Sequence, residues 1–235
     1  MAMTPEHHHR DITGGSARAA VFGVSDGLVS NASLILGVAG GAGHVSVVRL
    51  AGLAGLIAGA CSMAVGEYLS VSAQVELAQR ELRLERHEIV HNTGKEKAEL
   101  VRLYESRGVK AETAEEVATA LMADTDQALA VHAREELGVD PDKLGSPVRA
   151  AVASFVSFTL GAIVPLLPWL FGTGATTARV VASMVLAAGA AVAVGWVLGR
   201  FTGRSPAKVA ARQLILASIS AAIAFGIGHA VGATV

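Results

Sequence analysis

Two apolar stretches decide the fold: VFGVSDGLVSNASLILGVAGG at residues 21–41 and LAGLIAGACSMAVGEYLSVSAQV at residues 53–75. Each is long enough to cross the roughly 30 Å hydrocarbon core of a bilayer as a helix. Each carries a single acid, which is Asp26 in the first stretch and Glu67 in the second. A carboxylate at the centre of a span costs at least about 2.5 kcal/mol on insertion scales and by default marks a functional site. The two acids therefore predict a path for cations or protons through a membrane.

Three further stretches, 150–178, 180–199 and 214–235, contain no Asp, Glu, Lys or Arg. The hydrophobic fraction is 52% and the mean hydropathy is +0.50, both high for a soluble domain. Five such stretches favour membrane spans over a large core of buried helices. We therefore expect an all-α membrane protein with five transmembrane helices and a helical domain inserted between the second and the third. Its expected segments are a polar tail (1–18), two spans (19–75), the inserted domain (76–147) and three spans (148–235).

Basic residues in the short loops predict the orientation. Six lie on one side of the membrane: Arg10, Arg18, Arg200, Arg204, Lys208 and Arg212. Arg49 and Arg179 alone lie on the other side, so the positive-inside rule places the N-terminus and the 76–147 domain in the cytoplasm. The composition rich in Ala and Gly, with no recognisable targeting segment, favours a bacterial inner membrane. The net charge of −1 gives no reason to expect a nucleic-acid partner.

The two intramembrane acids are predicted to lie at one depth. Asp26 follows the cytoplasmic start of the first span and Glu67 precedes the cytoplasmic end of the second, which places both about 10–12 Å below that boundary. Met63 lies one turn from Glu67 on the same helix face. These three side chains are the predicted transport path. The alternatives are that Asp26 caps a helix broken at Gly27 and that Met63 only fills space.

The inserted segment carries paired acids. Residues 76–149 hold 16 of the 20 acidic residues, and four of these form two pairs with a spacing of three: Glu85 with Glu88, and Glu96 with Glu99. That spacing places both carboxylates of a pair on one helix face. A turn at 92–94 would bring the two pairs opposite each other. Carboxylate oxygens suit Mg²⁺, Ca²⁺ and Mn²⁺, and with an imidazole they also suit ferrous iron.

The imidazole is available at His132, four residues before Glu136 on a later predicted helix. We expect one helix over 95–106. A second helical region should begin at a capping box formed by Thr113 and Glu116 and break near 124–126. The alternative to a metal site is a solvated helical surface crossed by ion pairs. The pairs expected on that alternative are Glu76 with Arg80 and Glu99 with Arg102.

Enzyme motifs are missing from the sequence. Glu88 and His91 fit the Glu-x-x-His pattern of ferritin-like di-iron bundles, but no second such pair occurs outside the N-terminal tail. There is also no phosphate-binding loop, nucleophile elbow or paired-cysteine zinc motif. These observations argue against an iron-oxidising enzyme and against ATP-driven pumping. We expect a non-enzymatic protein with no tightly bound cofactor.

Over nearly its whole length the chain resembles the vacuolar iron transporter family. The resemblance is carried by RAAVFGVSDGLVSNASLILGVAG (18–40), AGLIAGACSMAVGEYLSVSAQ (54–74) and HAREELGVDP (132–141). It implies a homodimer of five-span subunits with a cytoplasmic three-helix metal-binding domain. It also implies export of ferrous iron, and often manganese, from the cytosol along a path between the subunits in exchange for protons.

The resemblance assigns a role to individual residues. The family's span-one aspartate falls on Asp26 and its span-two methionine on Met63. Its domain glutamates fall on the following positions: Glu85, Glu88, Glu96, Glu99 and Glu136. Where many members have a methionine four residues before the last of these, this chain has His132, which exchanges a thioether for an imidazole. The alternative function is a metal-responsive membrane scaffold or sensor that does not conduct.

Overall fold

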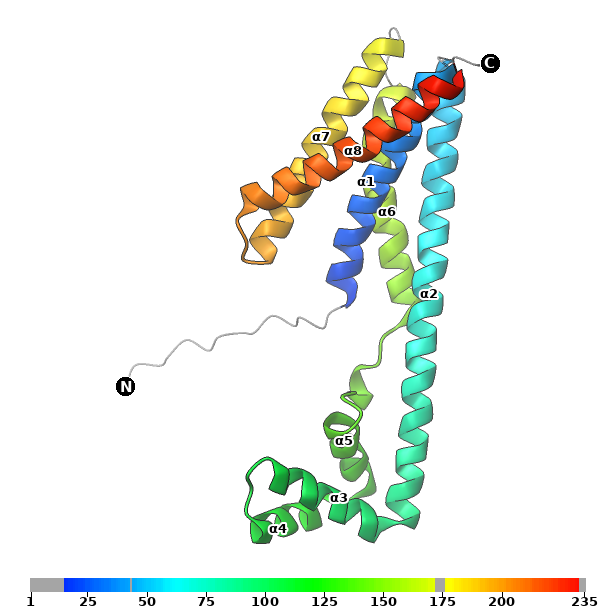
Figure 1. Cartoon of the computed structure of the whole chain (residues 1–235). Helices are drawn as coiled ribbons and strands as arrows, with labels where there is room; N and C mark the ends of the chain where they lie inside the picture. The colour runs from blue at the N-terminus through cyan, green and yellow to red at the C-terminus, as the bar shows by residue number, and fades with distance from the viewer. Residues whose placement is uncertain (1–14, 43, 172–175, 233–235) are drawn as a thin grey trace. The chain divides into compact units, whose positions relative to one another are not determined.

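The computed structural model describes residues 15–42, 44–171 and 176–232, which contain helices and no strand (Figure 1). The helices are α1 (Gly15–Ala42), α2 (Val45–His91), α3 (Thr93–Ser106), α4 (Ala111–Leu121), α5 (Thr125–Glu135), the 3-10 turn η1 (Pro141–Lys143), α6 (Pro147–Phe171), α7 (Thr176–Phe201) and α8 (Pro206–Gly232). Helices α1, α2, α6, α7 and α8 are long and apolar enough to cross a membrane. The expected all-α class with five candidate spans is confirmed. Residues 1–14 of the expected polar tail lie outside the described residues.

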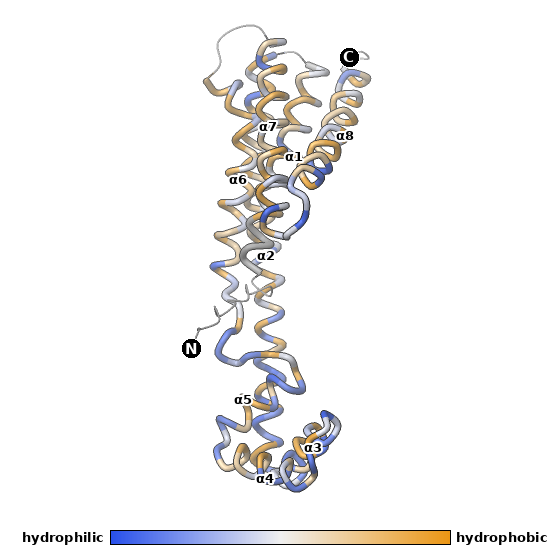
Figure 2. The backbone as a smooth tube through the Cα atoms, turned by 90° about the vertical axis from the view of Figure 1, so that its left-hand side faces the viewer, coloured by the Kyte–Doolittle hydropathy of each residue, from blue (hydrophilic) through white to orange (hydrophobic). Residues whose placement is uncertain are grey.

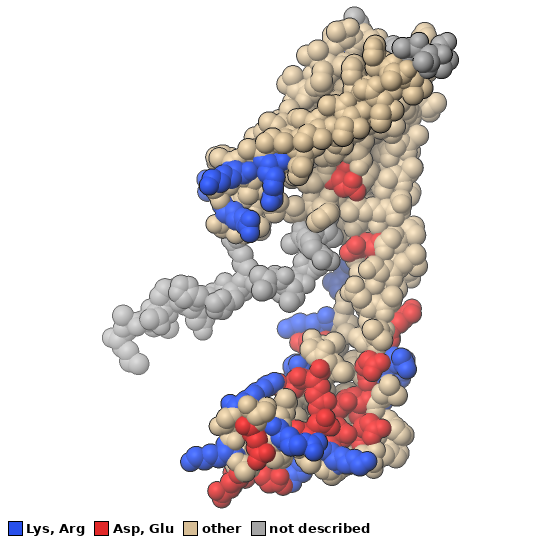
Figure 3. Space-filling view, in the orientation of Figure 1, with Lys and Arg blue, Asp and Glu red and all other residues tan. Residues whose placement is uncertain are grey.

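The chain divides into two compact units. The membrane unit comprises residues 1–68 and 148–235, and the acidic unit comprises Leu69–Pro147. Apolar residues dominate the long helices of the first (Figure 2), and charged residues crowd the surface of the second (Figure 3). Helix α2 belongs to both units. Its 47 residues extend for roughly 70 Å, more than twice the thickness of a hydrocarbon core, so part of it must lie outside any bilayer.

Glycines set the packing of α1 against α6. A Cβ atom at Gly23 would lie 2.6 Å from the Ser157 side chain, and one at Gly27 or Gly161 would overlap main-chain atoms of the facing helix. Such close approach is typical of helices in lipid, where van der Waals contact replaces the hydrophobic driving force. The first span is thereby held directly against the third.

Small residues also bring α8 against α1 and α7. A Cβ atom at Gly37 would lie 3.1 Å from the Ala224 carbonyl oxygen, and one at Gly195 would lie 2.6 Å from the Ala210 Cα atom. An apolar cluster of Ile35, Val48, Leu166 and Trp169 then joins α1, α2 and α6. Helix α1 therefore has neighbours on several sides, which fixes the direction of its polar side chains.

Prolines do not end α6. Proline inside a helix usually kinks or ends it, yet α6 continues through Pro165 and Pro168 to Phe171. Ser183 of α7 donates a hydrogen bond to the Pro165 carbonyl oxygen (2.7 Å) and accepts one from the Trp169 indole (2.8 Å). Neighbouring helices commonly satisfy the polar groups near a proline in a membrane helix, which is why proline is tolerated there.

The acidic unit is built from α3, α4, α5 and the C-terminal part of α2. Its apolar cluster contains Ile89, Ala128 and Leu129. The capping box expected at Thr113 is wrong, because α4 already begins at Ala111. The break between α4 and α5 is present, and the Asp124 side chain caps α5 by accepting a hydrogen bond from the Gln127 amide (2.8 Å).

Candidate metal centre and membrane pocket

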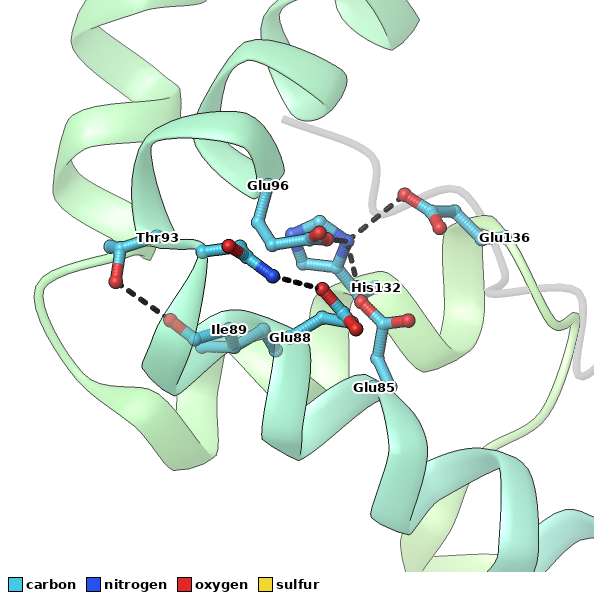
Figure 4. Close-up of polar contacts among 8 residues, drawn as sticks. Glu85, Glu88, Ile89, Thr93, Glu96, His132 and Glu136 are labelled. Carbon is cyan, nitrogen blue, oxygen red and sulfur yellow. Dashed lines mark hydrogen bonds and ion pairs between the residues drawn. The ribbon is translucent and has the colours of Figure 1, made fainter.

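A fully buried histidine forms the centre of the acidic unit. His132 lies on α5 with 0% of its side chain exposed. Its Nδ1 atom is 2.9 Å from Glu136 Oε1, 3.1 Å from Glu85 Oε1 and 3.8 Å from Glu96 Oε2. Figure 4 shows these carboxylates converging on the ring from α2, α3 and the C-terminal end of α5. One imidazole nitrogen thus faces three acidic side chains.

This arrangement leaves polar atoms unsatisfied. A protonated Nδ1 donates one hydrogen bond, and that bond is directed at Glu136. The close oxygen of Glu85 has no hydrogen-bond partner among the described residues, and neither has Nε2 of His132. Buried polar groups in folded proteins are nearly always paired, so each orphan requires an explanation. A cation placed among the carboxylates and Nδ1 would supply a partner for the Glu85 oxygen, although not for Nε2, which lies across the ring from Nδ1.

Basic side chains do not neutralise the cluster. Within the described ranges, the ion pairs of the acidic unit join Lys or Arg to other acids, among them Arg107 to Glu135 (2.5 Å) and Lys97 to Glu115 (2.5 Å). The ion pairs predicted for a solvated surface, Glu76 with Arg80 and Glu99 with Arg102, are not among those of the described residues. Arg80 pairs with Glu81 instead. The carboxylates around His132 therefore repel one another without compensation from lysine or arginine.

That repulsion and burial appear in the pKa values. Burial raises the pKa of Glu85 from 4.5 to about 7; His132 opposes the rise, and Glu136 and Glu96 add to it. Burial also raises the pKa of Glu96, again opposed by His132 and reinforced by Glu99, Glu136 and Glu88. Both carboxyls hold a proton more readily than usual because the metal-free site disfavours negative charge.

The six predicted ligands do not all lie equally close. Ligand atoms of Glu85, His132 and Glu136 lie within 4.8 Å of one another, which fits metal–ligand bonds of about 2.0–2.6 Å to a shared ion. Glu96 is buried beside them. Glu88 is exposed and accepts a hydrogen bond from Asn92 (2.5 Å).

Glu99 is also exposed, and its negative charge contributes to the raised pKa of Glu96. A carboxylate-rich site with one imidazole suits a divalent ion such as Mn²⁺ or Fe²⁺.

The membrane unit contains a polar pocket of about 320 Å³ between α1, α2 and α6. Asp26 and Met63 both line it, so the structure brings these two predicted path residues together. Ser30 donates a hydrogen bond of 2.6 Å to the Asp26 carboxylate. Helix α1 is unbroken at Gly27, so the alternative that Asp26 caps a broken helix is wrong. Glu67 is half-buried but does not line the pocket.

Sequence reasoning missed three polar residues of this pocket: Ser30, Asn31 and Ser62. Asn31 is 2% exposed and donates a hydrogen bond from Nδ2 to the Ala162 carbonyl oxygen (2.7 Å). The sequence does show an amide side chain inside an apolar span, five residues after Asp26. Because polar residues in spans are costly and face the bundle interior, this amide could have been predicted to line the path.

Comparison with known proteins identifies relatives along almost the whole chain. The sequence profile described as the VIT family matches residues 17–229. Vacuolar iron transporter 1 of Oryza sativa subsp. japonica is 32% identical over 98% of this chain and 92% of its own length. Vacuolar iron transporter 1 of Eucalyptus grandis is 32% identical over 96% and 91%. A vacuolar iron transporter of Acanthamoeba castellanii is 41% identical over 71% of this chain and 60% of its own length.

Proposed function

The chain belongs to the VIT family, whose members are transporters and not enzymes, and from this premise we propose that it exports ferrous iron or manganese from the cytosol in exchange for protons. The observation that carries the proposal is the pocket shared by Asp26 and Met63. A carboxylate and a thioether beside an open volume among membrane helices offer a divalent transition metal both a charged and a soft ligand.

The acidic unit would capture the metal before transport. The carboxylates of Glu85, Glu96 and Glu136 surround His132, and burial raises the pKa of Glu85 and of Glu96, so negative charge on these two groups is disfavoured without a cation. A divalent cation removes that penalty when it binds. On this proposal the acidic unit lies in the cytosol, where it would collect ions for the pocket.

Coupling to protons follows from the chemistry of Asp26. On this proposal a metal ion and a proton compete for the same carboxylate oxygens, so binding of one releases the other. This competition is the minimal requirement for antiport. Glu67, one turn from Met63, would share the proton.

A second copy of the chain would complete the path. The Asp26 side chain is exposed on the single chain, although α1 is apolar enough to lie in lipid. Exposure of a carboxylate to hydrocarbon is costly, so we propose a homodimer in which α1 of each subunit faces the other.

The test is uptake of Mn²⁺ and Fe²⁺ into sealed vesicles that contain the purified chain, with and without a pH gradient. We expect wild-type protein to accumulate metal only with the gradient. Asp26→Asn should abolish uptake while the acidic unit still binds metal, and Glu105→Gln, which removes an exposed charge outside the pocket, should transport normally.

Wild-type vesicles that bind metal without moving it would favour the non-conducting sensor. Normal uptake by Asp26→Asn, driven by the same gradient, would show that Asp26 is not the coupling residue.

A further inference from the structure

The side-chain oxygen of Asn31 is an unused ligand inside the membrane pocket. Nδ2 of Asn31 donates to the Ala162 carbonyl oxygen, which requires the amide nitrogen on that side and assigns the other atom as the carbonyl oxygen. That oxygen, Oδ1, is buried and has no hydrogen-bond partner among the residues that the structure describes. Half of the amide thus ties α1 to α6, and the other half has no role in the packing.

The unused oxygen faces α2 at the pocket wall. A Cβ atom built on Gly55 would lie 3.0 Å from Asn31 Oδ1, and both residues line the pocket. Glycine at this position avoids a side chain that would crowd the oxygen. The wall beside it carries hydroxyl, carboxylate and thioether groups from Ser62, Asp26 and Met63.

An orphaned oxygen in a membrane helix is destabilising, so an interaction in another state of the protein should compensate for it. Packing of α1 against α6 explains the hydrogen bond from Nδ2, but it gives no function to Oδ1. An uncharged amide oxygen is a common ligand for hard divalent cations. It binds them without the strong charge that would trap them.

Spacing places Asn31 at a second position along the path. It lies five residues beyond Asp26, which is roughly 7.5 Å farther along α1. Over that separation, one ion could bind both side chains at normal bond lengths only if they bent toward each other. Asn31 therefore provides a separate binding position for the ion, which we call a station. The pocket volume of about 320 Å³ leaves room for an ion that keeps several of its waters.

We propose that Asn31 Oδ1 is a neutral oxygen ligand for the transported divalent cation, at a station that follows Asp26 in the same pocket. The assignment rests on the proposed transport function for its direction, but the binding it asserts is measurable without transport. A neutral station after a charged one lets the ion leave Asp26 when a proton arrives.

The first experiment measures Mn²⁺ binding to the full chain in detergent. The parent protein for this experiment carries Glu85→Gln and Glu96→Gln, which weaken metal binding to the acidic unit. The remaining Mn²⁺ binding is then a measure of binding to the pocket. Asn31→Leu removes the oxygen and should weaken this binding about tenfold, as expected for loss of one partner at a desolvated polar group. Asn31→Asp retains an oxygen and should bind at least as tightly as the parent.

A structural role makes a different prediction. Both substitutions remove the Nδ2 donor to Ala162, so a purely structural asparagine predicts equal loss of affinity in both, in proportion to lost thermal stability. The matched control is Ser33→Ala, which removes the 3.1 Å hydrogen bond from Ser33 on α1 to Ser220 on α8, away from this pocket. It should leave Mn²⁺ affinity unchanged.

The second experiment detects the ligand directly. The chain has only two asparagines, Asn31 and Asn92, so carbon-13-labelled asparagine gives a simple spectrum. Electron–nuclear double resonance of bound Mn²⁺ should show a hyperfine coupling to the amide carbon that disappears in Asn31→Leu. Absence of that coupling in the parent, or wild-type affinity in Asn31→Leu, overturns the proposal.

Uptake assays separate this inference from the proposed function. In vesicles, Asn31→Leu should raise the KM for Mn²⁺ about tenfold with a smaller effect on the maximal rate. If wild-type vesicles take up no metal while the binding and resonance results hold, the transport proposal fails and the Asn31 ligand stands.

Discussion

Replacing Glu85 with glutamine should stabilise the metal-free acidic unit and weaken its binding of divalent cations. Burial raises the pKa of Glu85 from 4.5 to about 7, so the folded unit binds this proton more readily than the unfolded chain. The resulting stability is fully present below pH 4.5 and is lost as the pH rises through 7. Glutamine resembles the protonated acid at every pH and therefore avoids that loss.

The size of the effect follows from the same pKa. Each tenfold change in an ionisation constant corresponds to about 1.36 kcal/mol, so full conversion would give about 3.4 kcal/mol. Solvent screening at a partly accessible carboxylate reduces this figure. We expect the metal-free Glu85→Gln variant to be more stable than the wild type by about 2 kcal/mol near pH 8, and nearly equal to it below pH 4.5.

The assay is urea unfolding of a fragment covering residues 69–147, which forms a compact unit with its own apolar cluster, followed by circular dichroism. Saturating Mn²⁺ should reverse the order, because only the wild type gains the full free energy of metal binding. Glu105→Gln is the control, since this glutamate is exposed and forms no ion pair among the described residues. A variant less stable than the wild type at pH 8 without metal would refute the reasoning about buried charge.

Three further outcomes test other parts of the molecule. Replacing Glu88 and Glu96 together with alanine should strongly weaken Mn²⁺ binding to the 69–147 fragment, and unchanged calorimetric affinity with preserved helicity would remove them from the site. Cysteine pairs along α1, in a chain carrying Cys61→Ser, should cross-link between subunits with helical periodicity, whereas no inter-subunit product along that helix would exclude the proposed dimer. Gly161→Ala should destabilise the detergent-solubilised chain by about 1–3 kcal/mol, because its methyl group overlaps the main chain of α1. Gly226→Ala has open space and should melt like the wild type.

Burial selects among the acids that the sequence identifies. The spacing of three marks two pairs of glutamates, but it treats the two members of each pair as equivalent. A three-residue step rotates a helix by roughly 60° short of a full turn, so one member of a pair points inward more directly than the other. Glu85 and Glu96 are the members directed at His132, and Glu88 and Glu99 are exposed.

Helix ends show the same limit. Thr113 has the local chemistry of a capping residue, yet α4 begins at Ala111, and Ala114 and Ala118 lie fully buried on one face of it. Tertiary packing of that face outweighs a capping preference worth about 1 kcal/mol. Pro165 also stays within α6, where Ser183 on α7 bonds both its carbonyl oxygen and the Trp169 indole and thereby ties this part of the helix to its neighbour.

The sequence by itself determined the all-α class, the five apolar helices and the presence of an acid in each of the first two, because span length and the cost of a buried charge are local properties. Only the tertiary structure decided which groups meet. The packing of α1, α2 and α6 brings Asp26, Asn31 and Met63 to one pocket and leaves Glu67 outside its lining. Likewise the fold of α2, α3 and α5 places three carboxylates around one imidazole nitrogen, an arrangement between residues far apart in the chain that no local spacing encodes.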